Sequence, residues 1–154
     1  MELKFRQPGI DRAKAITDLF SSTIKAVNSA DYNPHQIMIW SSGNDISVWR
    51  KKISEQYFIT AEHEGKLVGF ASLAIDGLVD MFFVHKDFQR KGIGSQLLKE
   101  IEKNAIRLNI KRLYAEVSIT AKPFFESQGF KLIKVFIKTF KETEFEDNLM
   151  EKYL

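Results

Sequence analysis

The spacing of apolar and polar residues changes between strand-like and helix-like along the chain. Leu3 and Phe5 begin a short alternating strand, and Pro8-Gly9 turns the chain into a helix for which Asp11 is the predicted cap. The apolar face of this helix repeats with helical spacing and consists of Ala13, Ile16, Leu19, Phe20, Ile24 and Val27. The pattern predicts one short strand followed by an amphipathic helix.

A second helical region is less regular. It begins after Asn33-Pro34, continues to Trp40, breaks over Ser41–Asp45 and resumes from Ile46 to Ile53. Three strands are then predicted, over Tyr57–Glu62, Leu67–Ile75 and Val79–Val84, and the turn signal at residues 63–66 makes the first two a hairpin.

The second half of the chain alternates between the two patterns. A long amphipathic helix begins at Ile93, with the apolar set Leu97, Leu98, Ile101, Ala105 and Leu108, and precedes a strand over Arg112–Val117. Together with Val79–Val84 this gives a βαβ unit. A short helix holding Phe124 and Phe125 precedes a strand over Lys131–Phe140, and Asn148–Leu154 is a candidate last strand. The fold class is α/β with a mixed sheet.

Composition limits the chain to one domain and few functional classes. Its 154 residues, 44% hydrophobic and 28% charged, contain no linker-like segment, so residues 1–154 are predicted to fold as a single unit. No long apolar run occurs, so neither secretion nor a membrane partner is expected. There is no cysteine, which fits a cytoplasmic protein and excludes a cysteine nucleophile.

Charge and histidine spacing give two further expectations. The net charge of +3 is not concentrated in any basic block, so no nucleic-acid partner is expected. His35, His63 and His85 are scattered without the spacing of metal ligands, so no metal is expected.

The segment "HKDFQRKGIGS", residues 85–95, connects a predicted strand to the start of the long helix. The first amides of a helix lack internal partners and lie at the positive end of its dipole, and glycines let the backbone approach an oxyanion closely. Arg90 and Lys91 add positive charge. The segment matches neither the Walker A pattern nor GxGxxG. By itself it is either a phosphate-binding site or only a tight turn before the helix.

Three segments together resemble the GCN5-related N-acetyltransferase (GNAT) family. "VHKDFQRKGIGSQLL" resembles its acetyl-CoA motif, "GKLVGFASL" the preceding strand, and "SITAKPFFESQGF" its later strand-helix-strand motif. They fall within Tyr57–Phe140 in the family's order. "AVNSADYNPHQIMIW" and "NLMEK" resemble a bacterial branch of the family.

The resemblance implies a twisted, mostly antiparallel sheet flanked by helices, whose central strands splay apart to admit the pantetheine arm of CoA. Backbone groups of Phe82, Phe83 and Val84 would contact pantetheine. The pyrophosphate would lie on Gln89, Arg90, Lys91, Gly92, Ile93, Gly94 and Ser95.

The implied activity is direct transfer of an acetyl group from acetyl-CoA to a primary amine of a small molecule or peptide. The alternative is a non-catalytic acyl-CoA-binding or sensor module. A homodimer is compatible with the resemblance, because related proteins often dimerise.

Direct transfer poses two proton problems of different size. A lysine-like amine of pKa near 10.4 costs roughly 4 to 5 kcal/mol to deprotonate at pH 7, whereas leaving a cysteine-like thiol of pKa near 8.5 unprotonated costs about 2 kcal/mol. A base therefore matters more than an acid. Asp80 is the first candidate base, because strand alternation places it on one face with Phe82 and Val84, and Glu116 is the second. Either could instead be a solvated or salt-bridged strand carboxylate, and a water chain to bulk solvent is a third option.

The family's usual acid is a tyrosine, and the aligned residue here is Phe125, whose ring cannot donate a proton. Ser118 takes the place of an asparagine, and Ser118 or Thr120 could hydrogen-bond the sulfur or pantetheine. Phe124 is expected in the core, and Phe125 is expected to border the thioester and exclude water.

The acceptor is expected at the helical region before the first hairpin, which varies with substrate in the family. Four residues there are the acceptor-site candidates: Tyr32, His35, Trp40 and Trp49. Aromatic residues on amphipathic helices also commonly belong to the core.

Overall fold

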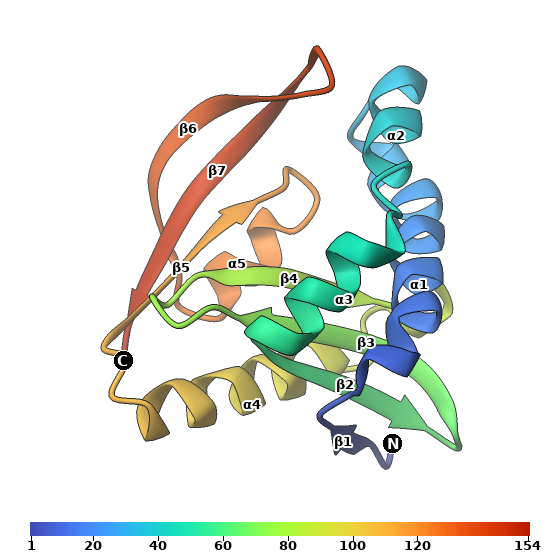
Figure 1. Cartoon of the computed structure of the whole chain (residues 1–154). Coiled ribbons are helices and arrows are strands. Elements are labelled where there is room, and N and C mark those ends of the chain that lie inside the picture. Colours follow the sequence, from blue (N-terminus) through green and yellow to red (C-terminus); the bar gives the residue numbers. More distant parts are fainter.

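Four antiparallel strands form the larger of two sheets in the computed structural model, which describes all 154 residues (Figure 1). Their order is β1 (Lys4–Arg6), β2 (Tyr57–His63), β3 (Lys66–Leu73) and β4 (Val79–Val84). The predicted hairpin is confirmed, with His63 opposite Lys66 and Tyr57 opposite Leu73.

A second sheet continues from the edge of the first but turns away from it. It contains β5 (Arg112–Val117), β7 (Thr143–Tyr153) and β6 (Lys131–Phe140), in that order and all antiparallel. A single parallel bridge, Leu78 with Tyr114, joins β4 to β5. Beyond this bridge the two strands separate (Figure 1), so the expected splay of the central strands is confirmed.

Three of the five helices cover the two faces of the larger sheet. The helices are α1 (Ala13–Ala26), α2 (Pro34–Ser41), α3 (Ile46–Glu55), α4 (Ile93–Arg107) and α5 (Lys122–Ser127), with 3-10 turns at Ile10–Arg12, Asn28–Ala30 and Lys86–Phe88. In Figure 1, α4 lies against one face of this sheet and α1 and α3 against the other. No helix combines the length and apolar character needed to cross a membrane.

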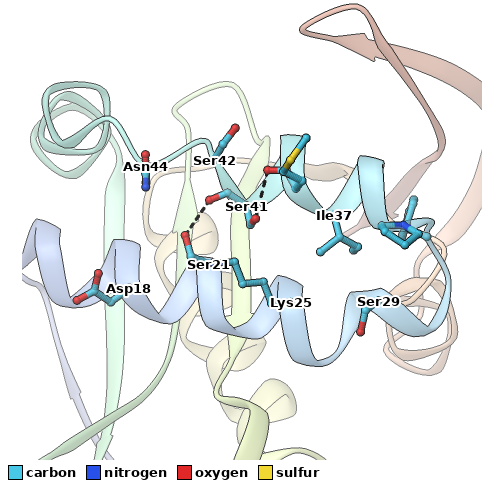
Figure 2. A pocket seen from close by; sticks show the side chains of 11 residues that line it. Asp18, Ser21, Lys25, Ser29, Ile37, Ser41, Ser42 and Asn44 are labelled. Atoms are coloured by element: carbon cyan, nitrogen blue, oxygen red, sulfur yellow. Dashed lines mark hydrogen bonds between the residues drawn. The ribbon is translucent and has the colours of Figure 1, made fainter.

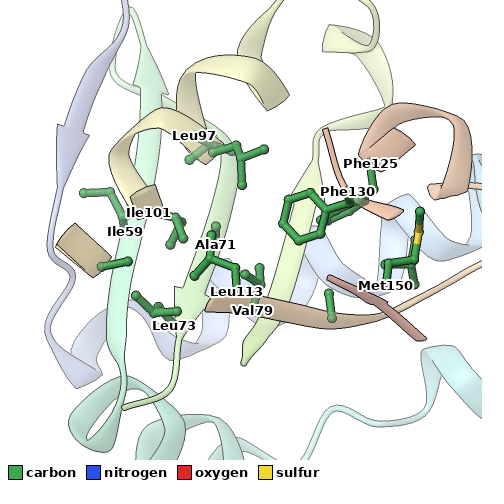
Figure 3. Close-up of a cluster of buried hydrophobic side chains, with 14 of the residues drawn as sticks. Ile59, Ala71, Leu73, Val79, Leu97, Ile101, Leu113, Phe125, Phe130 and Met150 are labelled. Atoms are coloured by element: carbon green, nitrogen blue, oxygen red, sulfur yellow. The ribbon is translucent and has the colours of Figure 1, made fainter. Parts of the chain in front are cut away.

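The sheet therefore separates two buried clusters. The larger packs α4 against β2 and β3 and extends through Leu113, Phe130 and Met150 into the second sheet (Figure 3). The smaller lies under α1 and α3 and contains Phe20 and Trp49. The larger cluster thus connects the two sheets on the side of α4 and α5.

A β-bulge in β4 contradicts the predicted alternation of Asp80, Phe82 and Val84. Ala71 pairs with Phe82 and Leu73 with Val79, so Asp80 and Met81 together lie opposite the single residue Ser72, whose hydroxyl accepts the Met81 amide at 3.1 Å. An extra residue reverses the alternation of side chains. Phe82 and Val84 consequently join the larger cluster, whereas Asp80 hydrogen-bonds to residues of the α3 region.

Three boundary predictions are also corrected. Asp11 lies inside the 3-10 turn, and no side chain caps this turn or α1, so the predicted cap is wrong. β3 ends at Leu73, and Ile75 is 89% exposed because the chain turns there. The last strand begins at Thr143, five residues before the predicted Asn148, because it pairs with the whole of β6.

Candidate active site

A cleft of about 1120 Å³ occupies the place where the two sheets separate. Its walls come from β4, the loop before α4, β5 and α5, and from the α1–α2 region facing the β6–β7 hairpin. Residues expected to bind the cofactor and residues expected to bind the acceptor therefore line one continuous space.

Most of the residues singled out in the sequence line this cleft. They are Tyr32, Trp40, Trp49, Asp80, Phe82, Phe83, Val84, Gln89, Arg90, Gly92, Ile93, Gly94, Ser95, Glu116, Ser118, Thr120 and Phe125. Lys91 and His35 do not line it. His35 is exposed on α2, where its Nε2 lies 3.2 Å from the hydroxyl of Thr143.

The loop before α4 presents its backbone amides without protein partners. No amide from Arg90 to Ser95 donates to a protein acceptor, while the Gln89 side chain donates to the Val84 carbonyl at 2.6 Å and braces the loop. Gly92 has φ +80°, and the space where its Cβ would lie is open. Arg90 and Lys91 are exposed and form no ion pair. Free amides, a helix dipole and two unpaired cations suit a pyrophosphate.

Phe124 and Phe125 pack in different ways. A Cβ on Gly94 would lie 3.0 Å from the Phe124 ring, so glycine permits α5 to pack closely on the first turn of α4. Phe125 is only 4% exposed and contacts the rings of Phe82, Phe124 and Phe130 at centroid distances of 5.4, 5.4 and 5.0 Å. The ring at the usual tyrosine position thus belongs to the core as well as to the cleft wall.

The two hydroxyls proposed to replace the tyrosine already have protein partners. Ser118 Oγ accepts the Ala121 amide at 3.1 Å, and Thr120 Oγ1 donates to Asp31 Oδ2 at 2.8 Å. The first bond lies within the turn between β5 and α5 and leaves the Ser118 hydroxyl free to donate, whereas the second connects this turn to the segment before α2.

The two carboxylates expected to act as bases both form ion pairs. Asp80 Oδ2 lies 2.6 Å from Lys52 Nζ and accepts from Gln56 Nε2 at 2.9 Å, with the Asp80 side chain 19% exposed. Glu116 Oε2 lies 2.5 Å from Lys138 Nζ on β6. Each carboxylate therefore has a cation beside it before any acceptor arrives.

Asp147, on β7, is a cleft carboxylate that the sequence pattern did not reveal. Burial raises the pKa of Asp147 to about 6. The backbone hydrogen bond from Asn148 and the positive charge of Lys138 lower it, but by less than burial raises it. The segment "TEFED", residues 143–147, is mostly polar, so its pattern by itself predicts no strand. Extending the last strand to Thr143 would have placed Asp147 on the face opposite to the buried Asn148 and Met150.

Aromatic rings enclose the acceptor side of the cleft. Tyr32 contacts Trp40 and Phe145 at centroid distances of 5.3 and 6.2 Å, and its hydroxyl accepts the Ile119 amide at 2.9 Å. Trp49 is 2% exposed and its indole donates to the Gly43 carbonyl at 2.9 Å, so it belongs mainly to the core. Burial raises the pKa of Tyr32 above its ordinary value.

Figure 2 shows a second pocket, of about 800 Å³, between α1 and α2. It is lined mostly by small polar residues, and Ser21 donates across it to the Ser41 carbonyl at 2.9 Å. Its Asp18 is paired with Lys14 at 3.0 Å. The pocket contains neither a glycine-rich loop nor converging carboxylates, so the cleft is the candidate active site.

The separation of β4 from β5 beside a loop with free amides is the arrangement that the resemblance to acyl-CoA acyltransferases predicted. Residues 28–152 match the family model described as an acetyltransferase (GNAT) domain, and the chain belongs to this family. It is therefore an acyltransferase.

Two similar proteins share the sequence and the fold of this chain, and a third shares its fold. An uncharacterized N-acetyltransferase of Escherichia coli (strain K12), YafP, is 33% identical over 134 residues, which is 87% of this chain and 83% of that protein. A structure described as a GCN5-related N-acetyltransferase from Rhodopseudomonas palustris has a TM-score of 0.92 at 25% identity, covering 99% of this chain and 95% of that one. The PaiA N-acetyltransferase of Thermoplasma acidophilum, in complex with coenzyme A, has a TM-score of 0.83 at 20% identity, with both chains fully covered.

Proposed function

We propose that the protein transfers an acetyl group from acetyl-CoA directly to a primary amine of a small molecule or peptide. The observation that supports the donor most directly is the run of free amides from Arg90 to Ser95 at the start of α4. These amides would bind the pyrophosphate, and the edge of β4 at Phe82, Phe83 and Val84 would face the pantetheine arm. The bound donor supplies an activated acyl thioester, and direct transfer fits a chain without cysteine.

Calorimetric titration with acetyl-CoA tests the donor site. Gly92→Glu should abolish measurable binding, because it places a side chain and a negative charge where the pyrophosphate would lie. Gly65→Glu is a matched control, since Gly65 also has positive φ (+78°) and open space at its Cβ but lies in the β2–β3 turn. Absence of binding by the parent protein would contradict the proposal.

A second candidate function, acyl-CoA binding without catalysis, is favoured by one observation. Phe125 has no hydroxyl, and the hydroxyl proton of Thr120 is already donated to Asp31. Thiol release in the presence of a broad panel of amines separates the two functions. We expect release with at least one amine, and binding of acetyl-CoA without release on every amine would favour the binding module.

The base is tested separately through pH. If Asp80 accepts the amine proton, Asp80→Asn should lower the rate most at low pH, where fewer acceptor molecules are already deprotonated. A pH profile with the parent's shape would exclude Asp80 as the base.

A further inference from the structure

Two carboxylates of the cleft wall, Glu146 and Asp147 on β7, have no cation partner, and of the two only Asp147 is half-buried. Asp80 and Glu116 are paired with Lys52 and Lys138, whereas Asp147 forms no ion pair. Its Oδ1 accepts the Asn148 amide at 3.0 Å, and its Oδ2 has no partner in the protein. Gln56 Oε1 is the only completely buried side-chain polar atom without a partner, so Asp147 Oδ2 is accessible.

The position of Asp147 is fixed by the sheet around it. Asp147 lies opposite Phe136 on β6, and its neighbour Asn148 pairs with Val117 at the end of β5, where the Asn148 side chain also donates to the Val117 carbonyl at 3.0 Å. β7 is thereby held against the end of β5, close to the turn that carries Ser118.

The surroundings of Asp147 suit an organic cation. Phe145, two residues earlier on the same strand, contacts the rings of Tyr32 and Trp40. Aromatic faces attract ammonium groups, and their apolar edges accept an alkyl or aryl chain. The charged and titratable groups facing Asp147 are Glu116 from β5, Lys138 from β6 and Tyr32 from the segment before α2. Lys138 is already 2.5 Å from Glu116.

We infer that Asp147 receives the ammonium group of the acceptor and accepts its proton, with the rings of Tyr32, Trp40 and Phe145 enclosing the rest of the molecule. The inference rests on the proposed acetyl transfer, and it defines the acceptor as a cationic amine with an apolar chain. The raised pKa of Asp147, about 6 instead of 3.8, makes proton acceptance about 100-fold less unfavourable than for an ordinary aspartate.

The proton and bond changes balance as follows. The ammonium group gives one proton to Asp147 Oδ2, and its freed lone pair forms a C–N bond to the acyl carbon. The C–S bond breaks, and its electron pair leaves on sulfur. The second nitrogen proton is lost as the amide forms and protonates the thiolate, while Asp147 releases its proton to water. One ammonium ion and one thioester give an amide, a thiol and one proton.

The first test uses two probes, phenethylamine and the neutral isostere phenethyl alcohol, with the Asp147 carboxyl carbon followed by NMR through a pH titration. We expect the apparent pKa of Asp147 to lie well above 4 and to fall when the amine is added, because the bound cation favours the carboxylate. The alcohol should leave it unchanged. An ordinary pKa that neither compound alters would overturn the inference, whether or not the enzyme acetylates this amine.

The second test uses kinetics. Asp147→Asn should lower kcat/KM at pH 7 by about 100-fold, the lower end of the range for general acid-base catalysis, and Asp147→Glu should recover part of the loss. Glu144→Gln, an exposed change on the same strand, is the control, and acetyl-CoA affinity should be the same in all of these variants. An active parent whose rate and pH profile persist in Asp147→Asn would remove Asp147 from the reaction and leave the proposed acetyl transfer standing. A parent without turnover on any amine would count against the transfer itself, and the NMR titration would then decide the binding role alone.

Discussion

At the scale of single residues, Phe125 shows how a missing group is replaced by packing. Its ring contacts three other phenylalanines and is 4% exposed, so Phe125→Ala should lower the free energy of unfolding by about 3 to 5 kcal/mol, as for other buried aromatic residues. Phe140→Ala, at a ring that is 40% exposed, should cost much less. Urea denaturation measures both.

The same position also distinguishes packing from a missing acid. If the ring serves packing alone, Phe125→Tyr should leave the turnover number within about twofold of the parent, because a hydroxyl at this position would then have no proton to supply in the reaction. A turnover well above the parent's would show that the site lacks a proton donor.

The stability of the protein should depend on pH through Asp147. The folded pKa of this residue, about 6, lies above its ordinary value of 3.8, so the parent loses stability relative to Asp147→Asn as pH rises from about 4 through 6. The full shift is worth nearly 3 kcal/mol, and because the side chain is partly exposed we expect Asp147→Asn to be about 1 kcal/mol more stable at pH 7.

Urea midpoints of the two proteins at pH 4, 5.5 and 7 measure this effect. The difference should be close to zero at pH 4, where the aspartate is protonated and resembles asparagine. A difference that is the same at every pH would mean that the carboxyl of Asp147 has an ordinary affinity for protons. Glu144→Gln again serves as the control.

The residues predictable from the sequence are those whose chemistry is local. Gly92 and Gly94 stand where a helix begins, so the local pattern predicts either a tight turn or a phosphate site there, and the structure leaves the amides free. The partners Lys52 and Lys138 are 28 and 22 residues away from the carboxylates that they pair with. Such pairs depend on which elements meet, and no local pattern contains that information.

At the scale of elements, α2 is held over the cleft by its own first turn. Asn33 Oδ1 accepts the Gln36 amide at 2.8 Å, Gln36 Oε1 accepts the Asn33 amide at 2.9 Å, and Gln36 Nε2 donates to the Glu144 carbonyl on β7 at 2.9 Å. The capping box therefore also connects α2 to the strand that carries Asp147.

Loss of this capping box should weaken binding of the amine acceptor more than binding of acetyl-CoA. Asn33→Ala should cost about 1 kcal/mol of stability and raise the KM for the amine, while the calorimetric affinity for acetyl-CoA stays unchanged. Ile101→Val, which should cost a similar amount in the core under α4, controls for a general loss of stability. An unchanged KM for the amine in Asn33→Ala would mean that α2 does not shape the acceptor site.

A helix or strand could be predicted from the sequence where its apolar residues keep one regular spacing from end to end. The helices and the hairpin strands follow from their spacing, but the bulge in β4 does not, because "VDMFFV" has no glycine or break to mark the extra residue. The consequence is large for a candidate base, since the bulge turns Asp80 toward α3. The extra length of β7 was hidden because its first half, "TEFED", is mostly polar and pairs with an exposed strand.

At the scale of the whole molecule, the two sheets share a core but hardly any backbone pairing. Only the Leu78–Tyr114 bridge joins β4 to β5, while Leu113, Phe130 and Met150 connect the sheets through side chains. The alternation of strands and helices predicts a mixed sheet. It does not predict that β4 and β5 separate, because the spacing of residues within a strand carries no information about the distance to its neighbour. That expectation came from the resemblance to the GNAT family. A homodimer stays a prediction.

The separation of β4 from β5 allows a test of which segments contact the bound CoA. Amides from Arg90 to Ser95 have no protein acceptor, and β4 has no partner strand on the side of the gap, so both segments should exchange hydrogen readily in the free protein. Saturation with CoA at about 100 times its Kd should slow exchange in both segments by up to about 100-fold. ADP, which carries a pyrophosphate but no pantetheine, should slow only residues 90–95.

This pair of ligands separates the contribution of the loop from that of the strands. Protection of β4 by CoA but not by ADP would mean that the pantetheine arm supplies the backbone partner that β5 does not provide. Equal protection of β4 by both ligands would instead mean that binding at the loop tightens the whole sheet. The Gly92→Glu protein should show neither effect, which ties any protection in the parent to the loop before α4.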